Sequence, residues 1–138
     1  MQIREISLKE LYEAYALVKQ LRKDLTYEAF EDLVYEMKHM EYKMFGLFEK
    51  DALLSFAGVA IQTNLYHKRH LFVFDLVTDE PWRFMGYARM LLDYLQDFAK
   101  TAMCENVVLW GGFCTQDAQM FYEKRGFSST GELFVKSL

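Results

Sequence analysis

The chain has 138 residues, of which 52% are hydrophobic and 17% aromatic, and its formal net charge is −4. This composition excludes a disordered chain, and the length suits a single domain over residues 1–138 with a sizeable core. The mild acidic balance excludes a basic nucleic-acid face, and no apolar run is long enough to span a membrane. The first residues carry no signal-peptide pattern, so we predict a cytoplasmic protein.

The N-terminal half predicts a strand, two helices and then three strands. Ser7 and Glu10 have the spacing of a capping box, and Thr26 can cap a second helix. The apolar stripe predicted for that second helix consists of Phe30, Leu33, Val34, Met37 and Met40. From Glu41 the period changes to that of strands. The strands predicted in this half are 3–6, 42–49, 53–65 and 71–78, with turns near 50–51 and at 66–69.

The C-terminal half predicts a helix, a strand, a second helix and one or two final strands. Apolar residues follow helical spacing from Ala88 to Ala102, and the continuous apolar run 107–110 predicts a buried strand. A short helix is predicted at 115–124, and final strands within 127–138. A strand, helix and strand in this order make a right-handed parallel crossover. The predicted class is therefore α/β, with a mixed sheet and helices on both faces.

The turn between the strand 71–78 and the helix after it has the chemistry of an anion site. Its residues are Arg83-Phe84-Met85-Gly86-Tyr87-Ala88-Arg89. The first N–H groups of a helix have no acceptor inside it, and the helix dipole is positive there. Gly86 allows a ligand to approach the backbone, and the two arginines can pair with phosphate oxygens. Because the turn lacks the lysine of a nucleoside-triphosphate loop and the three-glycine dinucleotide pattern, a pyrophosphate without bound metal fits best.

Two motifs resemble those of the GNAT superfamily of N-acetyltransferases. Arg83-x-x-Gly86-x-Ala88 resembles the family motif for the pyrophosphate of coenzyme A, and residues 118–127 resemble a later family motif. The two motifs flank the strand 107–110, and the order of segments matches over nearly the whole chain. The resemblance implies a GNAT-like mixed, mostly antiparallel sheet with a central splayed parallel strand pair, here 71–78 and 107–110, and helices on both faces.

The resemblance also implies where acetyl-coenzyme A, the expected co-substrate, binds. Backbone groups at Leu76, Val77 and Thr78 would lack sheet partners on the splayed side and would bond the pantetheine arm. A backbone N–H near Val77 would polarise the thioester carbonyl. The pyrophosphate would lie on the N–H groups of the turn, which belong to Phe84, Met85, Gly86, Tyr87, Ala88 and Arg89.

The implied reaction is direct acetyl transfer to an amine, in which one group takes a proton and another gives one. Tyr122 matches the family tyrosine near the thioester sulfur, so we assign it as the general acid. Asp75 interrupts an apolar strand, and burial would raise its pKa, so it is our candidate base. The base could instead be Glu41, Tyr42 or another acid, and Tyr122 and Asp75 could both have structural roles.

Two positions depart from the family pattern. Phe84 stands where the family often has glycine, at a variable position. Thr115 stands where the family often has asparagine; a threonine keeps one hydrogen bond to the cofactor but not the full set of an amide. Neither departure argues against the fold.

The histidine and cysteine residues of the sequence do not predict a metal site. His67 and His70 flank basic residues in a predicted turn, and Cys104 and Cys114 lack the spacing of metal ligands.

Because the first two helices cover the acceptor side in the family, aromatic residues are candidates for the acceptor pocket. They are Tyr27, Phe30, Tyr35 and Tyr66.

We therefore expect an N-acetyltransferase that moves an acetyl group from acetyl-coenzyme A to a primary amine of a small molecule. A peptide or protein amine is the alternative acceptor, because no local motif identifies it. A non-catalytic acyl-coenzyme A sensor and a structural domain that binds no coenzyme are the alternatives from other classes. An exposed C-terminal edge strand would invite pairing with a second copy, which leaves a homodimer open.

Overall fold

The structure is a computed structural model, and it describes residues 1–110, 115–131 and 133–138. Cys114 therefore lies outside the described residues. The chain divides into two compact units, an N-terminal unit, Met1–Val108, and a C-terminal unit, Leu109–Leu138. The N-terminal unit holds helices α1 (Leu11–Leu21), α2 (Tyr27–Met37) and α3 (Tyr87–Thr101), with strands β1 (Gln2–Glu5), β2 (Lys43–Glu49), β3 (Ala52–Asn64) and β4 (Lys68–Thr78). Strand β5 (Asn106–Leu109) crosses the boundary, and α4 (Gln116–Lys124) lies in the C-terminal unit.

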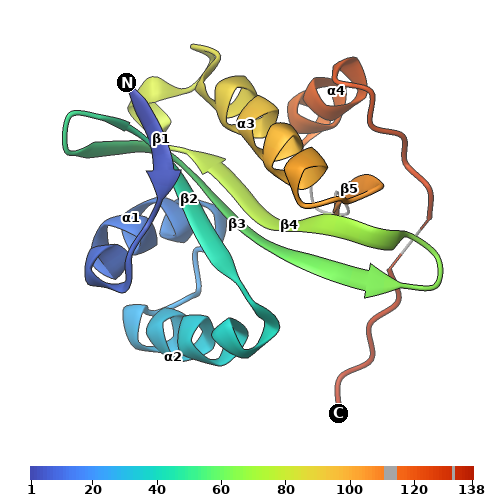
Figure 1. Cartoon of the computed structure of the whole chain (residues 1–138). Coiled ribbons are helices and arrows are strands. Elements are labelled where there is room, and N and C mark those ends of the chain that lie inside the picture. The colour runs from blue at the N-terminus through green and yellow to red at the C-terminus, as the bar shows by residue number, and fades with distance from the viewer. Residues whose placement is uncertain (111–114, 132) are drawn as a thin grey trace. The chain divides into compact units, whose positions relative to one another are not determined.

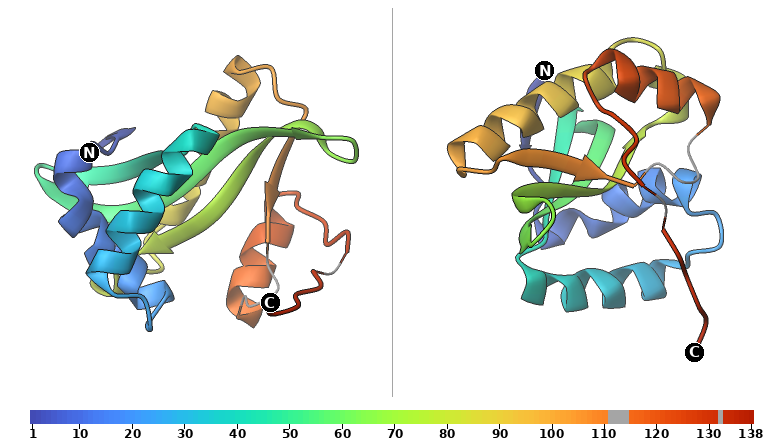
Figure 2. Two further views of the ribbon diagram at one scale, coloured as in Figure 1. Left: turned by 90° about the horizontal axis from the view of Figure 1, so that it is seen from below. Right: turned by 90° about the vertical axis from the view of Figure 1, so that its right-hand side faces the viewer.

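The sheet has the strand order β1-β2-β3-β4-β5, and its first three pairs are antiparallel. Strand β5 begins beside the beginning of β4, where Glu105 N donates to Arg69 O at 2.7 Å and Asn106 Nδ2 donates to His67 O at 3.0 Å. The two strands therefore run in parallel, joined by the crossover helix α3. Figure 1 shows α1 and α2 on one face of the sheet and α3 on the other, and Figure 2 shows the same layers from two further sides.

Local sequence signals account for the helix starts. Glu10 accepts from the backbone N–H of Ser7 at 2.9 Å and completes the capping box, with a short 3₁₀ turn, Leu8–Glu10, leading into α1. The Thr26 hydroxyl accepts from Ala29 N at 3.2 Å and caps α2. Both caps satisfy N–H groups that a helix start leaves unpaired, which confirms these two predictions.

The core lies on both faces of β3. Every residue from Leu53 to Ala60 is buried, which is typical of a strand covered on both sides. Helix α3 covers one face with Leu91, Leu92, Leu95 and Ala99, and α1 and α2 cover the other with residues that include Leu17, Phe30 and Val34. Burial of these side chains positions β4, the strand that carries most of the candidate site.

Several sequence predictions are corrected. The described residues of 127–138 form no strand, because a strand needs a partner and no other described segment pairs with them. Leu33 is 47% exposed, since only the Phe30 and Val34 side of α2 meets the sheet, and Met40 is 42% exposed in the 3₁₀ turn Lys38–Met40 that follows the end of α2. Residues 68 and 69 belong to β4 instead of a turn, and Val107 and Val108 are only partly buried because β5 stands at the end of the strand order. None of the helices in the described residues is long and apolar enough to cross a membrane.

The Glu10 carboxylate gives a first testable prediction. Arg4 donates to both of its oxygens, at 3.0 and 2.7 Å, and together with the Ser7 N–H lowers the pKa of Glu10 from 4.5 to about 2. A lowered native pKa stabilises the fold above pH 4.5, and this contribution is lost as the pH falls toward 2. We expect Glu10→Gln to cost about 1 kcal/mol of unfolding free energy at pH 7 and much less at pH 3, measured by urea denaturation.

The matched control is Glu28→Gln, which removes an exposed carboxylate from the first turn of α2. Its effect should be smaller and should not depend on Arg4. An equal loss for both variants at pH 7 would show that helix-dipole charge alone accounts for the effect.

Candidate active site

The main chain of β4 has one open side near its end. Asp79 N donates to Leu54 O at 2.9 Å, and the register pairs Ser55 with Thr78 and Phe56 with Val77. In an antiparallel ladder, residues alternate between those that bond to the partner and those that point away. Val77 therefore faces β3, whereas Leu76 and Thr78 direct their N–H and C=O groups to the opposite side.

Strand β5 does not extend far enough to cover that side. It has four residues against eleven in β4, and it begins beside Arg69. At about 3.3 Å per residue it ends before Leu76. Within the described residues of the N-terminal unit, the groups that point outward at Leu76 and Thr78 are therefore open, with one exception: the Thr78 carbonyl accepts from Arg83 Nε at 2.9 Å. The alternation turns the main-chain N–H of Val77 toward β3, and the N–H that points to the open side belongs to its neighbour Leu76.

A β-bulge precedes the open side. Gly58 pairs with Asp75 and the next residue, Val59, pairs with Val73, so Phe74 is an extra residue in β4. A bulge bends its strand and leaves the extra residue outside the ladder. The Phe74 carbonyl accepts from Arg22 Nη2 at 3.4 Å. The bulge thus bends β4 just before its open side.

The turn before α3 presents unpaired N–H groups to open space. Gly86 is the N-cap residue with φ +84°, and no described side chain caps the helix. By helix geometry, Tyr87, Ala88 and Arg89 have no acceptor for their N–H groups inside α3. A Cβ built at Gly86 would meet nothing within 4 Å, so a ligand has room against the backbone. This arrangement fits a pyrophosphate, the group for which the turn was predicted.

Arg83 holds the turn to the strand and to α1. Besides the Thr78 carbonyl it bonds Gln20 Oε1, at 3.0 Å from Nη2. Gln20 also accepts from Glu80 N at 3.0 Å and donates to Asp79 Oδ1 at 2.8 Å, so one side chain fixes three residues about sixty positions away. Sequence reasoning expected phosphate pairing from Arg83 and did not find Gln20, which carries no local signal. Arg89 is exposed beside the N-terminus of α3.

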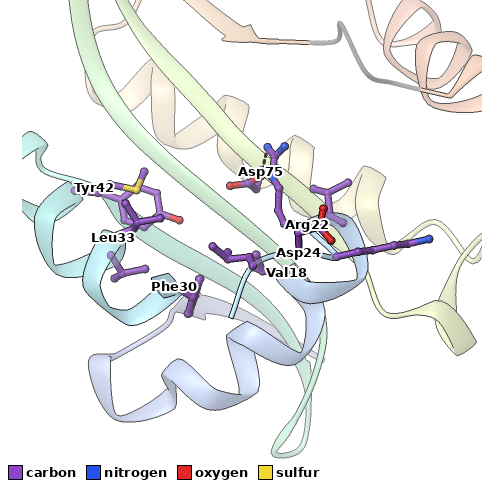
Figure 3. A pocket seen from close by; sticks show the side chains of 12 residues that line it. Val18, Arg22, Asp24, Phe30, Leu33, Tyr42 and Asp75 are labelled. Carbon is purple, nitrogen blue, oxygen red and sulfur yellow. Dashed lines mark hydrogen bonds and ion pairs between the residues drawn. The ribbon is translucent and has the colours of Figure 1, made fainter. Parts of the chain in front are cut away.

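A cavity of about 590 Å³ lies between α1, α2 and β4 (Figure 3). Apolar residues line most of it: Val18, Leu21, Leu25, Phe30, Leu33, Val34 and Met37. The polar lining consists of Arg22, Lys23, Asp24, Tyr42 and Asp75. Of the four aromatic residues predicted for an acceptor pocket, only Phe30 lines this cavity; Tyr27 packs on Tyr12 and Tyr15, and Tyr35 and Tyr66 are exposed.

Asp75 is one of two carboxylates that line the cavity, and β4 contributes it. Arg22 donates to its Oδ1 from both Nε (2.9 Å) and Nη2, and the Asp75 side chain is only 17% exposed. Burial raises the pKa of Asp75 above its ordinary value, and Arg22 opposes that rise. A carboxylate in such a place is a stronger base than one in water, as a general base requires.

The two alternative bases are less suitable. Burial, and then the charge of Asp75, raise the pKa of the Tyr42 phenol, so it stays protonated at neutral pH. Glu41 is exposed and does not line the cavity. Among the candidates of the N-terminal unit, Asp75 is therefore the residue best suited to accept a proton.

Two predicted site residues lie in the C-terminal unit. The Thr115 hydroxyl accepts from Ala118 N at 3.2 Å and caps α4, which leaves its own proton free to bond elsewhere. Tyr122 lies near the end of α4, half-buried between the rings of Phe121 and Phe127 at 5.4 and 5.7 Å. Their roles toward the cofactor stay predictions. Over the described residues, no cluster of three His, Cys, Asp or Glu side chains suits a metal ion.

Comparison with known proteins agrees with this fold. The model of the acetyltransferase (GNAT) family matches residues 6–127. A relative from Bacillus subtilis (strain 168), the uncharacterized N-acetyltransferase YhdJ, is 35% identical over 132 residues, covering 94% of this chain and 93% of the relative. The chain therefore belongs to the acetyltransferase (GNAT) family, a family of acyltransferases, which confirms the resemblance and the fold class.

Solved structures show the same fold. An aminoglycoside N-acetyltransferase in complex with coenzyme A has a TM-score of 0.85 and 17% identity, covering 99% of this chain and 93% of that one. Glucosamine-6-phosphate N-acetyltransferase from Arabidopsis thaliana has a TM-score of 0.77 and 21% identity, covering 99% and 97%. At these identities the likeness concerns the fold.

Gly86 gives the second prediction. In Gly86→Ala the added methyl group would occupy the open space before the N–H groups of α3, so we expect the Kd for coenzyme A to rise about tenfold or more, measured by calorimetry. Alanine at φ +84° also costs about 1 kcal/mol of stability. Gly126→Ala is the control, because Gly126 has φ +89° and is equally open. An equal loss of affinity in the control would point to backbone strain as the cause.

Proposed function

We propose that this protein transfers an acetyl group from acetyl-coenzyme A directly to a primary amine of a small molecule. The observation that carries the proposal is the position of two consecutive residues of β4. Asp75 belongs to the wall of the cavity, and Leu76 directs its main-chain groups to the open side of the strand. An acceptor in the cavity and a thioester on the strand would therefore meet at one place.

The main chain would hold the donor. The outward groups of Leu76 and the N–H of Thr78 are suited to the amide-bearing pantetheine arm, which would extend the sheet as an added strand. The Leu76 N–H is the donor we assign to the thioester carbonyl, where negative charge develops. The turn from Phe84 to Arg89 would bind the pyrophosphate, and the Thr115 hydroxyl keeps a proton to donate to the cofactor.

In the reaction a nitrogen–carbon bond forms and the carbon–sulfur bond of the thioester breaks. The Asp75 carboxylate would accept the proton that the amine loses, and the Tyr122 phenol would give a proton to the leaving thiolate. The net products are an amide and free coenzyme A. Because Tyr122 lies in the C-terminal unit and Asp75 in the N-terminal unit, we propose that both units act as one domain, as the family match across the boundary supports.

A small acceptor is favoured over a peptide or protein by the lining of the cavity. Ten residues of α1, α2 and their connection, together with Tyr42 and Asp75, enclose about 590 Å³, a size within the range of small-molecule pockets. The names of two structural neighbours, an aminoglycoside and a glucosamine-6-phosphate N-acetyltransferase, describe small amine acceptors. The direct test is saturable release of free thiol from acetyl-coenzyme A with a panel of small primary amines and lysine peptides. Release with the peptides alone would overturn the small-molecule assignment.

Tyr122 gives the third prediction. Tyr122→Phe removes the proposed proton donor but keeps the ring that packs on Phe127, so kcat should fall about 100-fold while the Kd for acetyl-coenzyme A stays within about twofold. Stopped-flow thiol detection and calorimetry measure the two quantities. Tyr66→Phe, at an exposed hairpin tip, is the control and should leave both unchanged. Unchanged turnover in Tyr122→Phe would remove this tyrosine from the chemistry.

Asp75 gives the fourth prediction. The carboxylate must be ionised to accept a proton, so kcat/KM should fall on the acid side with a pKa above the ordinary aspartate value of 3.8. Asp75→Asn should lower kcat/KM by about 100-fold and abolish that acid limb. Asp24→Asn removes the other acid of the cavity and should leave the limb in place. If the limb persists in Asp75→Asn, another group is the base.

A further inference from the structure

One feature of the cavity has no role in the proposed reaction: the guanidinium group of Arg22 bonds to the proposed base, Asp75. Arg22 directs Nε and Nη2 at one oxygen of Asp75, and Nη2 also at the carbonyl of the bulged Phe74. A carboxylate oxygen and a main-chain carbonyl together form a cation subsite. In Figure 3 this subsite is filled by a side chain of the protein itself.

An alkylammonium group has the right donors to take that place. It carries one positive charge and three N–H donors, the same number of hydrogen bonds that Arg22 makes to Asp75 and Phe74. An amine that is to be acetylated must reach the proposed base, Asp75, but the Arg22 guanidinium already bonds to that carboxylate. The ammonium group and the Arg22 guanidinium cannot both make all of their hydrogen bonds to the same oxygen of Asp75.

Arg22 is well placed to leave. It follows the last residue of α1 and its side chain is 43% exposed, so its charged end can move into water with little loss. Burial raises the pKa of Asp75 and Arg22 lowers it, and an ammonium that replaces Arg22 takes over this charge compensation, so the carboxylate is not left without a cation during the exchange. The other charged groups that line the cavity, Lys23 and Asp24, come from the same segment.

The cavity also limits what the amine can carry. Figure 3 shows Arg22 and Asp24 on one side of Asp75, and Phe30, Leu33 and Tyr42 on the other. The side formed by α2 is apolar, with Tyr42 contributing a protonated phenol. An apolar body is stabilised on this side, whereas a second charge here would lose its hydration, because Asp24, the other carboxylate of the cavity, lies on the opposite side of Asp75 (Figure 3).

We propose that Arg22 occupies the subsite of the acceptor ammonium and is displaced from Asp75 and the Phe74 carbonyl when the amine binds, so that the enzyme selects an amine with one cationic group and an apolar body. Arg22 is on this view a specificity-determining residue that competes with the substrate. The inference rests on the proposed function only for the fate of the amine; the exchange itself is a binding event.

The probes are hexylamine and 1,6-diaminohexane, which differ by a second ammonium at the far end of the same chain. Calorimetry with the full-length protein should show at least tenfold tighter binding of hexylamine. Arg22→Gln removes the competing cation and should tighten hexylamine binding at least fivefold. Arg22→Lys retains a charge but loses the fork of donors, and should lie between the wild type and Arg22→Gln.

Lys23→Gln is the matched control, because it removes the same charge from the neighbouring residue of the cavity. It should change hexylamine binding less than twofold, and thermal unfolding should confirm that each variant is folded. Equal tightening in Arg22→Gln and Lys23→Gln would show a general charge effect and overturn the proposal. Unchanged or weaker binding in Arg22→Gln, or a preference for the diamine, would overturn it as well.

Thiol release measured on the same samples separates this inference from the proposed function. Tighter binding in Arg22→Gln without turnover of any amine in the wild type would support the exchange and overturn the acetyl transfer. Turnover of hexylamine with no effect of Arg22 on its binding would overturn the exchange and support the acetyl transfer.

Discussion

The site depends on how β4 divides its main-chain hydrogen bonds between two sides. An antiparallel strand bonds its partner through alternate residues. If the strand has a partner on one side only, half of its main-chain polar groups therefore have no partner in the sheet. In β4 the main-chain groups of Val77 bond to β3. Those of Leu76 and Thr78 point to the other side, beyond the end of β5. Unpaired main-chain groups in a largely covered strand need partners. A ligand with amide groups has the donors and acceptors for this role, which is the basis for the binding that we propose for the pantetheine arm.

The pair of Gly58 and Asp75 joins the open strand to the cavity. Gly58 has no room for a Cβ, because the Tyr42 hydroxyl lies against it, and the register places Asp75 opposite. The bulge at Phe74 falls on the next step of the same ladder. A glycine, a tyrosine and an extra residue thus act together: the glycine admits the phenol that lines the cavity, and the bulge directs the carboxylate beside it.

Features that local rules govern could be predicted from the sequence. The capping box at Ser7, the Thr26 cap and the apolar stripe of α3 each depend on residues within a few positions, and so does the glycine turn before α3. The Gln20 and Arg22 contacts join residues more than fifty positions apart, and no local pattern encodes them. The bulge at Phe74 depends on how β3 and β4 align, and the sequence of one strand alone does not determine that alignment. The sequence predicts final strands within 127–138, but a strand also needs a partner, and none pairs with this segment in the described residues.

Asp75 costs the fold stability at the pH at which the site would work. Its native pKa is raised, so between the unfolded and native pKa values the folded chain holds more protons, and stability falls as the pH rises through that range. Arg22 offsets part of this cost while it remains paired, yet the pair is open enough to exchange. A buried apolar residue at position 75 would be simpler for packing, since the neighbouring Val73 and Val77 are buried. The carboxylate with an exchangeable partner is therefore better explained by a cation that binds there than by the needs of the core.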